Sequence, residues 1–427
     1  MKKTRPAILV FVLIVVCGLM AFRGLQTGPQ SVIKTTPKVY PTFLFLSDVH
    51  LNTQSATTSY GYDTGTELWK AFLNKVDQLL AAPNAPQFIV YTGDLPAHYS
   101  CDPTCYLPPA QRATHNANIK AILQGLEGLA MKYYKPIFYL PGNNDGLAGD
   151  YYSFADEQQR TPLSLTPVLP AGFFPSGRAE QTHIPCIVSA PHPTMGYYSA
   201  YPIKGLRLIA LNTIIYNAAF TAVDGTTQLK DGNTQMAWLA QQLADAEAKK
   251  EKVYIAMHVP PGTDAYSGNS MWVPLPDNTS IWQDQFLNLT SRYQSTIAGI
   301  LYGHTHMDEV RRLYDTTGNI TEVAISCPGV TPQHYNNPGF KIVQYDPASM
   351  ELMDFTTYFT TPANSIWGDS TYTFSGTYSS SPGTSIYQQL SSMQPGAVAN
   401  CMGNTFTVHN GPAGYNIAAG IEVKAGH

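Results

Sequence analysis

The sequence predicts an α/β fold with one sheet buried on both faces and a second, more antiparallel sheet packed near it. Short apolar runs alternate with helical patterns over the first 300 residues, which is typical of strands and helices in a layered sheet. After residue 308 the pattern changes to successive strands joined by turns. With 44% hydrophobic and 11% aromatic residues, the 427-residue chain has ample material for a core.

The elements follow from these patterns in order. Met236, Leu239 and Leu243 lie on one face of the third expected helix, as amphipathic packing requires. The expected strands are 43–46, 88–91, 137–140, 206–211, 253–257 and 297–302, and later 310–314, 321–326, 340–345 and 352–358. The expected helices are 67–81, 112–132 and 234–250.

Two segments lack such patterns. Residues 146–205 are irregular and aromatic, which is typical of an inserted or functional loop. Residues 361–427 are rich in Ser, Gly and Tyr, with a short helix expected at 386–393. We expect this tail to pack as an ordered extension, with a flexible segment as the alternative.

The amino end resembles an export signal. Lys2, Lys3 and Arg5 precede an apolar run from residue 7 to 22 that is slightly short for a membrane span. We therefore expect residues 1–22 to be a signal peptide, and the protein to be secreted or periplasmic. A retained membrane anchor is the alternative, and lipidation at Cys17 is less favoured. A linker at 23–41 follows.

The net charge argues against binding to a nucleic-acid duplex, and the cysteine content is consistent with an exported protein. Removal of the signal changes the net charge from −4 to −7, and no basic run remains to bind a nucleic-acid duplex. Export permits disulfides, and the neighbours Cys101 and Cys105 are the expected pair. A metal site at these cysteines would lack a second cysteine cluster.

Polar side chains follow five of the expected strands. Ligands of open α/β sheets bind at the carboxyl ends of strands, so these side chains should converge. In extended backbone, residues two apart point to the same side, and Gly303 allows a close turn. Each piece alone would be read as a turn, a cap or a buried histidine, but together they predict a metal site. The donors are Asp48, His50, Asp94, Asn143, His258, His304 and His306.

The ordered motifs DVH, GD, GNND, H and GHTH resemble those of the calcineurin-like metallophosphoesterases. Further stretches are similar to the acid sphingomyelinase-like phosphodiesterase branch, namely residues 93–98, 211–213, 238–239, 258–262, 330–332 and 337–340. The resemblance covers residues 42–360, which would form the catalytic domain. It implies a four-layer sandwich of two mixed β-sheets flanked by helices, with two divalent metal ions. For this branch the resemblance implies two zinc ions, and iron or manganese also suits imidazole-rich ligation.

The resemblance also implies a role for each donor. Asp48, His50 and His306 would hold one metal, and Asn143, His258 and His304 the other. Asp94 would bridge them. A hydroxide between the metals would attack phosphorus in a phosphodiester or phosphoanhydride.

Three more residues are candidates for contact with substrate. His98 follows Asp94 by four residues and would be the general acid, because histidine suits proton transfer near neutral pH. Asn144 stands where the family usually has a histidine. It could donate a hydrogen bond to phosphate but not a proton. Tyr216 would line the substrate pocket.

The expected substrate is a small phosphate ester. The roughly 20 residues between signal and first strand are too few for a lipid-presenting domain, so a nucleotide, a choline phosphodiester or polyphosphate is favoured over a membrane lipid. Polyphosphatase or phosphomonoesterase activity on the same site is an alternative. A non-catalytic binding protein that keeps the metals is an alternative of another class.

Overall fold

The computed structural model describes residues 39–101, 104–166, 187–273, 281–364, 366–411 and 414–426. The chain divides into Met1–Val39 and Tyr40–His427, and the second unit contains the folded elements described below. The expected signal segment, with Cys17, lies outside the described residues.

One sheet has six strands. Its central pairs β1–β2 and β2–β3 are parallel, and β11 joins β1 in antiparallel register with Leu44 opposite Ile342. The strand order is β13 (Thr371–Thr373), β12 (Leu352–Phe359), β11 (Gly339–Tyr345), β1 (Thr42–Leu46), β2 (Ile89–Tyr91) and β3 (Ile137–Tyr139).

The other sheet has eight strands. Its centre, β10–β8–β7–β6, is parallel, and antiparallel strands extend it on both sides. The order is β14 (Glu422–Val423), β9 (Val310–Tyr314), β10 (Ile320–Ser326), β8 (Ile297–Tyr302), β7 (Lys252–Ala256), β6 (Leu206–Ala210), β5 (Tyr198–Ile203) and β4 (Ile187–Ser189).

The fold class of two mixed sheets flanked by helices is confirmed, but the division of strands between the sheets differs from expectation. Strands before residue 308 were expected in one sheet and later strands in the other. Instead, each sheet joins early and late strands, β1 with β11 and β8 with β10. A buried apolar run shows that a strand is in the interior, but not which strand lies beside it.

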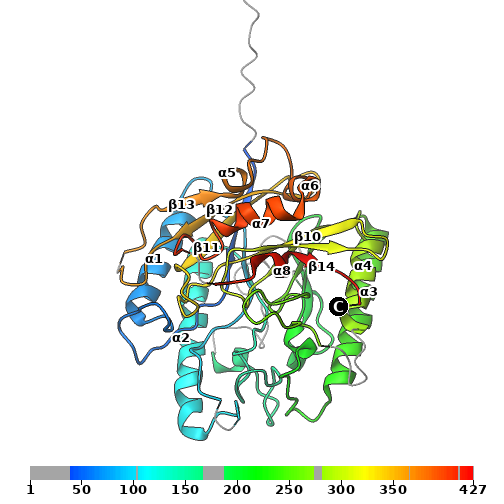
Figure 1. Cartoon of the computed structure of the whole chain (residues 1–427). Coiled ribbons are helices and arrows are strands. Elements are labelled where there is room, and N and C mark those ends of the chain that lie inside the picture. Colours follow the sequence, from blue (N-terminus) through cyan, green and yellow to red (C-terminus); the bar gives the residue numbers. More distant parts are fainter. Residues whose placement is uncertain are drawn as a thin grey trace, which may run out of the picture. The chain divides into compact units, whose positions relative to one another are not determined.

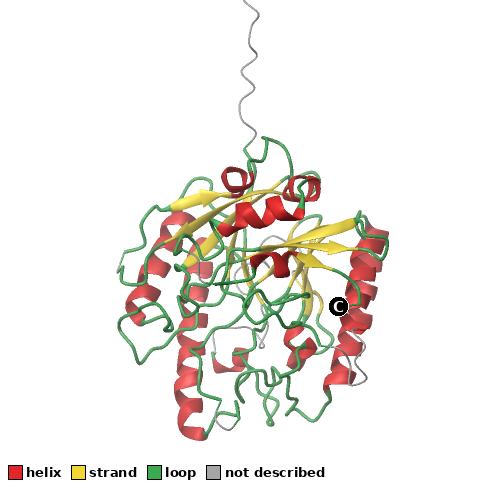
Figure 2. Ribbon diagram, viewed as in Figure 1, coloured by secondary structure: helices red, strands yellow, loops and turns green. Residues whose placement is uncertain are grey.

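Four long helices cover the two sheets from outside. Helices α1 (Thr66–Ala81) and α2 (Pro109–Tyr133) pack together beside the six-stranded sheet, while α3 (Gln228–Lys249) and α4 (Ile281–Arg292) pack beside the eight-stranded sheet (Figures 1 and 2). Helix α3 begins six residues before the expected position, because the Thr227 side chain accepts a hydrogen bond from the Lys230 amide at 3.3 Å and caps it. Helix α4 was not anticipated.

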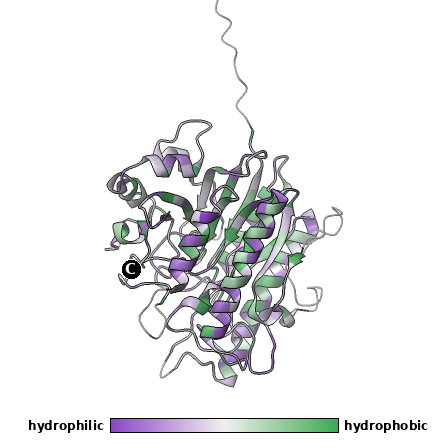
Figure 3. Cartoon of the chain, turned by 90° about the vertical axis from the view of Figure 1, so that its right-hand side faces the viewer, coloured by the Kyte–Doolittle hydropathy of each residue, from purple (hydrophilic) through white to green (hydrophobic). Residues whose placement is uncertain are grey.

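Strand β6 of the eight-stranded sheet carries apolar residues on both faces because each face meets a packed layer. In β6, Leu208 and Ala210 join the core that contains β1, whereas Ile209 joins a second core beneath α3 and α4. Figure 3 views these helices from outside and shows hydrophilic and hydrophobic residues mixed along them. Within the described part of the chain, every helix is too short or too polar to span a bilayer.

The segments without clear patterns are partly regular. The expected irregular region includes β4, β5 and two short 3₁₀ helices, Pro162–Leu165 and Pro193–Met195. A further 3₁₀ helix, Thr213–Tyr216, follows β6. The tail forms α5 (Phe374–Tyr378), α6 (Ile386–Ser392), α7 (Pro395–Gly403) and α8 (Ile417–Ile421). Its strands β13 and β14 pair with β12 and β9, so the tail extends both sheets.

The disulfide expected between Cys101 and Cys105 is confirmed. Cys101 and Cys105 form a disulfide in the loop after β2. Cys327 is buried and Cys401 half-buried, both as free thiols, and Cys186 lies outside the described residues.

A buried histidine fixes the loop after β3 to helix α2. His115 Nε2 donates to the Gly146 carbonyl oxygen at 3.0 Å, and the side chain is 1% exposed. Burial lowers the pKa of His115 to about 4, because the charged ring would lose its hydration.

This histidine should make the fold sensitive to acid. Its folded pKa lies below the usual 6.5, so its contribution to stability is complete above pH 6.5 and is lost as the pH falls toward 4. Between pH 7 and pH 4 the free energy of unfolding should fall in both proteins. We expect this fall to be smaller in His115→Gln than in wild type, by up to about 3 kcal/mol. Denaturant titrations at several pH values would measure this. The exposed His192→Gln serves as control, and equal pH dependence in all three proteins would contradict the prediction.

Candidate metal centre

The seven expected donors meet where the two sheets face each other. Strands β1, β2 and β3 are neighbours in one sheet, and β7 and β8 are neighbours in the other. Because all five strands were expected in one sheet, their polar ends were expected along a single sheet edge. That expectation is wrong, because the edges of two sheets contribute. Among the contacts that join them, His258 Nδ1 donates to the Thr92 carbonyl oxygen at 2.6 Å, and the His304 amide donates to Asp48 Oδ2 at 3.0 Å.

Five of the seven expected donors lie in left-handed turns rather than in extended backbone. Asp48, His50, Asp94, His304 and His306 have φ angles of 50°, 45°, 61°, 75° and 61°. Non-glycine residues seldom adopt this region, and clusters of them mark functional sites. The side chains two apart therefore converge because the chain turns sharply, and the expected strand-like geometry is wrong.

Two glycines allow the turns to touch. A Cβ on Gly303 would lie 2.0 Å from Ser47 Oγ, and one on Gly142 would lie 2.2 Å from Asp94 Oδ1. Any side chain at these positions would push the ligand loops apart. The expected role of Gly303 is confirmed.

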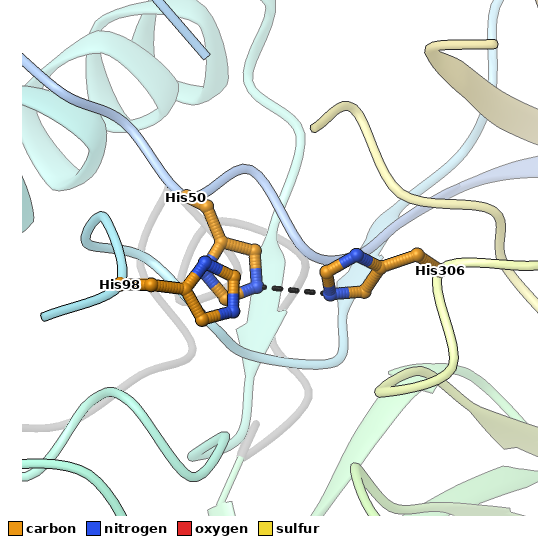
Figure 4. A group of neighbouring side chains, drawn as sticks. All are labelled: His50, His98 and His306. Carbon is orange, nitrogen blue, oxygen red and sulfur yellow. Dashed lines mark hydrogen bonds between the residues drawn. The ribbon is translucent and has the colours of Figure 1, made fainter. Parts of the chain in front are cut away.

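The first donor set contains Asp48, His50, Asp94 and His306, whose ligand atoms lie within 4.8 Å of one another. His50 Nδ1 donates to the Pro96 carbonyl oxygen at 3.0 Å, so Nε2 carries the lone pair. That nitrogen faces His306 Nε2 at 3.1 Å (Figure 4) and Asp94 Oδ2 at 3.2 Å. Lone pairs and carboxylates that face one another in a buried space require a cation or protons between them.

The second donor set contains Asp94, His258, His304 and Asn143. Asn143 Oδ1 lies 2.9 Å from both His258 Nε2 and His304 Nδ1. Asp94 Oδ2 lies 3.3 Å from His258 Nε2 and so stands between the two sets. Nitrogen and oxygen donors without thiolates, divided into two sets that share a carboxylate, fit two divalent cations.

The titration behaviour of the donors reflects the need for positive charge. Burial alone would lower the pKa of His258, but Asp94 outweighs it and raises that pKa to about 9. Burial would raise the pKa of Asp94, yet His258 and His50 hold it well below its usual range. Burial, reinforced by His258, lowers the pKa of His304 to about 4. Protons on some of the rings thus neutralise the carboxylates where a cation would do so.

His98 lies at the edge of the first donor set. Its ring stacks on that of His50 (Figure 4). The two ring centroids are 3.9 Å apart, and the His98 side chain is 32% exposed. His98 Nδ1 donates to Asp63 Oδ1 at 2.7 Å, which leaves Nε2 for another partner. The carboxylate of Asp63 thereby fixes the ring and its tautomer. Asp63 was not anticipated, because no local pattern distinguishes it.

Asn144 and Tyr216 were both expected to contact substrate. The Asn144 backbone amide and Nδ2 donate to Asp94 at 2.8 and 3.0 Å, so this residue holds the shared carboxylate. Tyr216 has no exposed surface, packs on Trp272 and Trp282, and accepts a hydrogen bond from Gln235. Its expected place in the substrate pocket is wrong, because it belongs to the second core.

A cleft adjoins the second donor set. It has a volume of about 140 Å³, and its walls include Asp264, Tyr266, His304, His334 and Tyr415. The His334 ring also stands edge-on to His306 with centroids 4.6 Å apart. The tail contributes Tyr415, whose hydroxyl donates to the His334 carbonyl oxygen at 2.9 Å.

The sequence matches the model of the calcineurin-like phosphoesterase family over residues 41–308. One curated relative, a protein of Dictyostelium discoideum named sphingomyelinase phosphodiesterase D, is 29% identical over 73% of this chain and 64% of its own length. The cyclic GMP-AMP phosphodiesterase of Mus musculus is 35% identical over 42% of this chain and 40% of its own length. The chain therefore spans less than two thirds of these relatives.

Solved structures show a more distant likeness. A dimetal phosphatase of Danio rerio aligns with 79% of this chain and 99% of its own, at 12% identity and a TM-score of 0.47. A solved structure of PhoD aligns with 79% of this chain and 69% of its own, at 13% identity and a TM-score of 0.44.

The shared position of Asp94 yields a prediction on metal content. We expect protein loaded with divalent metal and freed of excess to retain about two equivalents, and Asp94→Asn to retain less than one, because both donor sets lose their common carboxylate. Elemental analysis of the purified proteins would measure this. Asp77→Asn, which changes a half-buried acid on α1 that pairs with Lys132 rather than with either donor set, should match wild type. Full metal content in Asp94→Asn would contradict the shared role.

Proposed function

This chain belongs to the calcineurin-like phosphoesterase family, and from that membership we propose that it is a phosphodiesterase that uses two zinc ions to hydrolyse small phosphate esters. The observation that carries the proposal is the pair of buried donor sets that meet at Asp94. The names of the curated relatives, which are phosphodiesterases, support diester chemistry.

We assign the seven donor residues to two cation sites that share Asp94. Asp48, His50, His306 and Asp94 would hold one cation, and Asn143, His258, His304 and Asp94 the other. When bound, such a pair neutralises the phosphate oxygens and lowers the pKa of the attacking water. The protein aligns the donors, and the carbonyl oxygens of Pro96 and Thr92 keep His50 and His258 in the tautomers that present Nε2.

His98 is placed to protonate the leaving oxygen. Its Nδ1–H bond to Asp63 directs Nε2 away from that carboxylate, beside the ligands His50 and His306. In this arrangement a carboxylate orients a histidine that transfers a proton, as general acid catalysis requires. Asn144 cannot supply the proton, and its amide already holds Asp94.

The cleft beside His304 would receive part of the substrate. Its walls combine the aromatic rings of Tyr266, His334 and Tyr415 with the carboxylate of Asp264. Such a lining suits a small organic group more than a long polyanion, which favours a nucleotide or choline phosphodiester over polyphosphate. The apolar run after Lys2, Lys3 and Arg5 supports export, so the substrate would be met outside the cytoplasm.

Hydrolysis of bis-p-nitrophenyl phosphate tests the proposed activity. We expect turnover that a chelator abolishes and added Zn²⁺ restores. A panel of nucleotides, choline phosphodiesters, phosphomonoesters and polyphosphate would then rank the substrates. Metal-loaded, folded protein without turnover on any of them would support the non-catalytic alternative.

The role of His98 depends on the leaving group. We expect His98→Ala to reduce kcat by roughly 10²–10⁴-fold on an alkyl phosphodiester, which needs a proton on the leaving oxygen. On a p-nitrophenyl ester, whose leaving group departs without one, the loss should be much smaller. Asp63→Asn should show the same pattern to a lesser degree. Equal losses on both esters would show that His98 is not the acid.

A further inference from the structure

We propose that Asp150 and Tyr151, which follow Asn143 in the loop after β3, are positioning residues that orient two ligands of the second cation, Asn143 and His304. The inference rests on the proposed two-metal centre and assigns the residues that organise one half of it. Neither residue touches substrate or metal in this assignment.

Asp150 determines which end of the Asn143 amide faces the site. The amide has an oxygen that can bind a cation and a nitrogen that cannot. Asn143 Nδ2 donates to Asp150 Oδ1 at 2.8 Å, and Oδ1 therefore points to His258 Nε2 and His304 Nδ1, each 2.9 Å away. Without this acceptor the amide could rotate and present its NH₂ group to the cation.

Tyr151 fixes His304 in the same way. Its hydroxyl oxygen lies 3.3 Å from His304 Nε2, and the two rings meet edge to face. Because His304 presents Nδ1 to the site, Nε2 carries the proton and donates it to Tyr151 Oη. Consecutive residues in extended backbone would point to opposite sides, but Tyr151 has a φ of 56°, so both side chains reach the centre.

The backbone fixes this pair of residues to the ligand loop. The Tyr151 amide donates to the Asn143 carbonyl oxygen at 2.8 Å. From outside, the Cys105 loop packs so closely on Gly149 that an added Cβ would lie 2.0 Å from the Cys105 carbonyl oxygen. The Leu107 amide also donates to the Ala148 carbonyl oxygen at 2.8 Å. Asp150 and Tyr151 therefore sit on a segment held from both sides.

The two donor sets differ in this support. In the second set, Thr92, Asp150 and Tyr151 occupy the outer atoms of His258, Asn143 and His304. In the first set, His306 Nδ1 is buried with no hydrogen-bond partner among the described residues. Asp150 and Tyr151 bond to Asn143 and His304, which both belong to the second set. Loss of either residue should therefore weaken binding of the second cation and leave binding of the first unchanged.

Calorimetric titration of metal-stripped protein with Zn²⁺ tests the assignment. We expect wild type to bind two equivalents, and Asp150→Ala to bind the first normally and the second about 10–100-fold more weakly. Asp150→Asn, whose amide oxygen still accepts from Asn143, should bind both within a few-fold of wild type. Tyr151→Phe should weaken the second equivalent about 10-fold. The control Asp77→Ala, at a half-buried acid of α1 that pairs with Lys132, should change neither.

Kinetics at limiting zinc add a second measure. Turnover of Asp150→Ala should return toward wild type as zinc increases, without a matching change in the KM for bis-p-nitrophenyl phosphate. Thermal melts identify variants that fail to fold, and Tyr151→Phe decides the question if Asp150→Ala is one of them.

Three results would overturn the assignment. Two normal equivalents in both Asp150→Ala and Tyr151→Phe, or equal weakening of both equivalents, would disprove positioning while the two-metal centre stands. Fewer than two equivalents in wild type would disprove the centre itself, and the assignment with it.

Discussion

At the centre of this fold, buried lone pairs and carboxylates face one another at hydrogen-bond distance. His50 Nε2 and His306 Nε2 are 3.1 Å apart, and Asp94 reaches both His50 and His258. Such a cluster opposes folding unless positive charge enters it, since desolvation and repulsion act together. The surrounding structure is arranged to hold it: left-handed turns aim the ligands inward, and Gly303 removes the side chain that would separate the turns.

The same constraint explains why two sheets are needed. Three ligand loops follow β1, β2 and β3, and two follow β7 and β8, so each sheet supplies part of the centre. The parallel strands bring their carboxyl ends to the junction, and the helices outside keep the sheets pressed together. Asp94 belongs to one sheet but lies against His258 from the other. The separation of two cations would therefore depend on how the sheets pack.

The donor residues could be predicted from the sequence, but the residues that orient them could not. Asp48, His50 and His304 could be predicted because each follows an apolar strand, and such strand ends converge in α/β folds. Asp63, which meets its partner only in the folded chain, has no comparable local signal. The pairing of β1 with β11 depends on contacts about 300 residues apart, so local patterns placed these strands in different sheets. Tyr216 failed as a candidate because composition cannot separate a pocket tyrosine from a core one.

The tail joins the two halves of the site through one buried network. Asp308, two residues after the expected donor His306, binds Lys341 of β11 at 2.5 Å and the Tyr372 hydroxyl of β13 at 2.7 Å. Its amide donates to the carbonyl oxygen of Phe406 in the tail. The Thr357 hydroxyl of β12 also donates to this carboxylate at 2.8 Å. Asp308 thus connects the loop after β8 in the eight-stranded sheet to three strands of the six-stranded sheet. Because β13 and β14 also extend one sheet each, the segment after residue 361 braces the junction on which the ligand geometry depends.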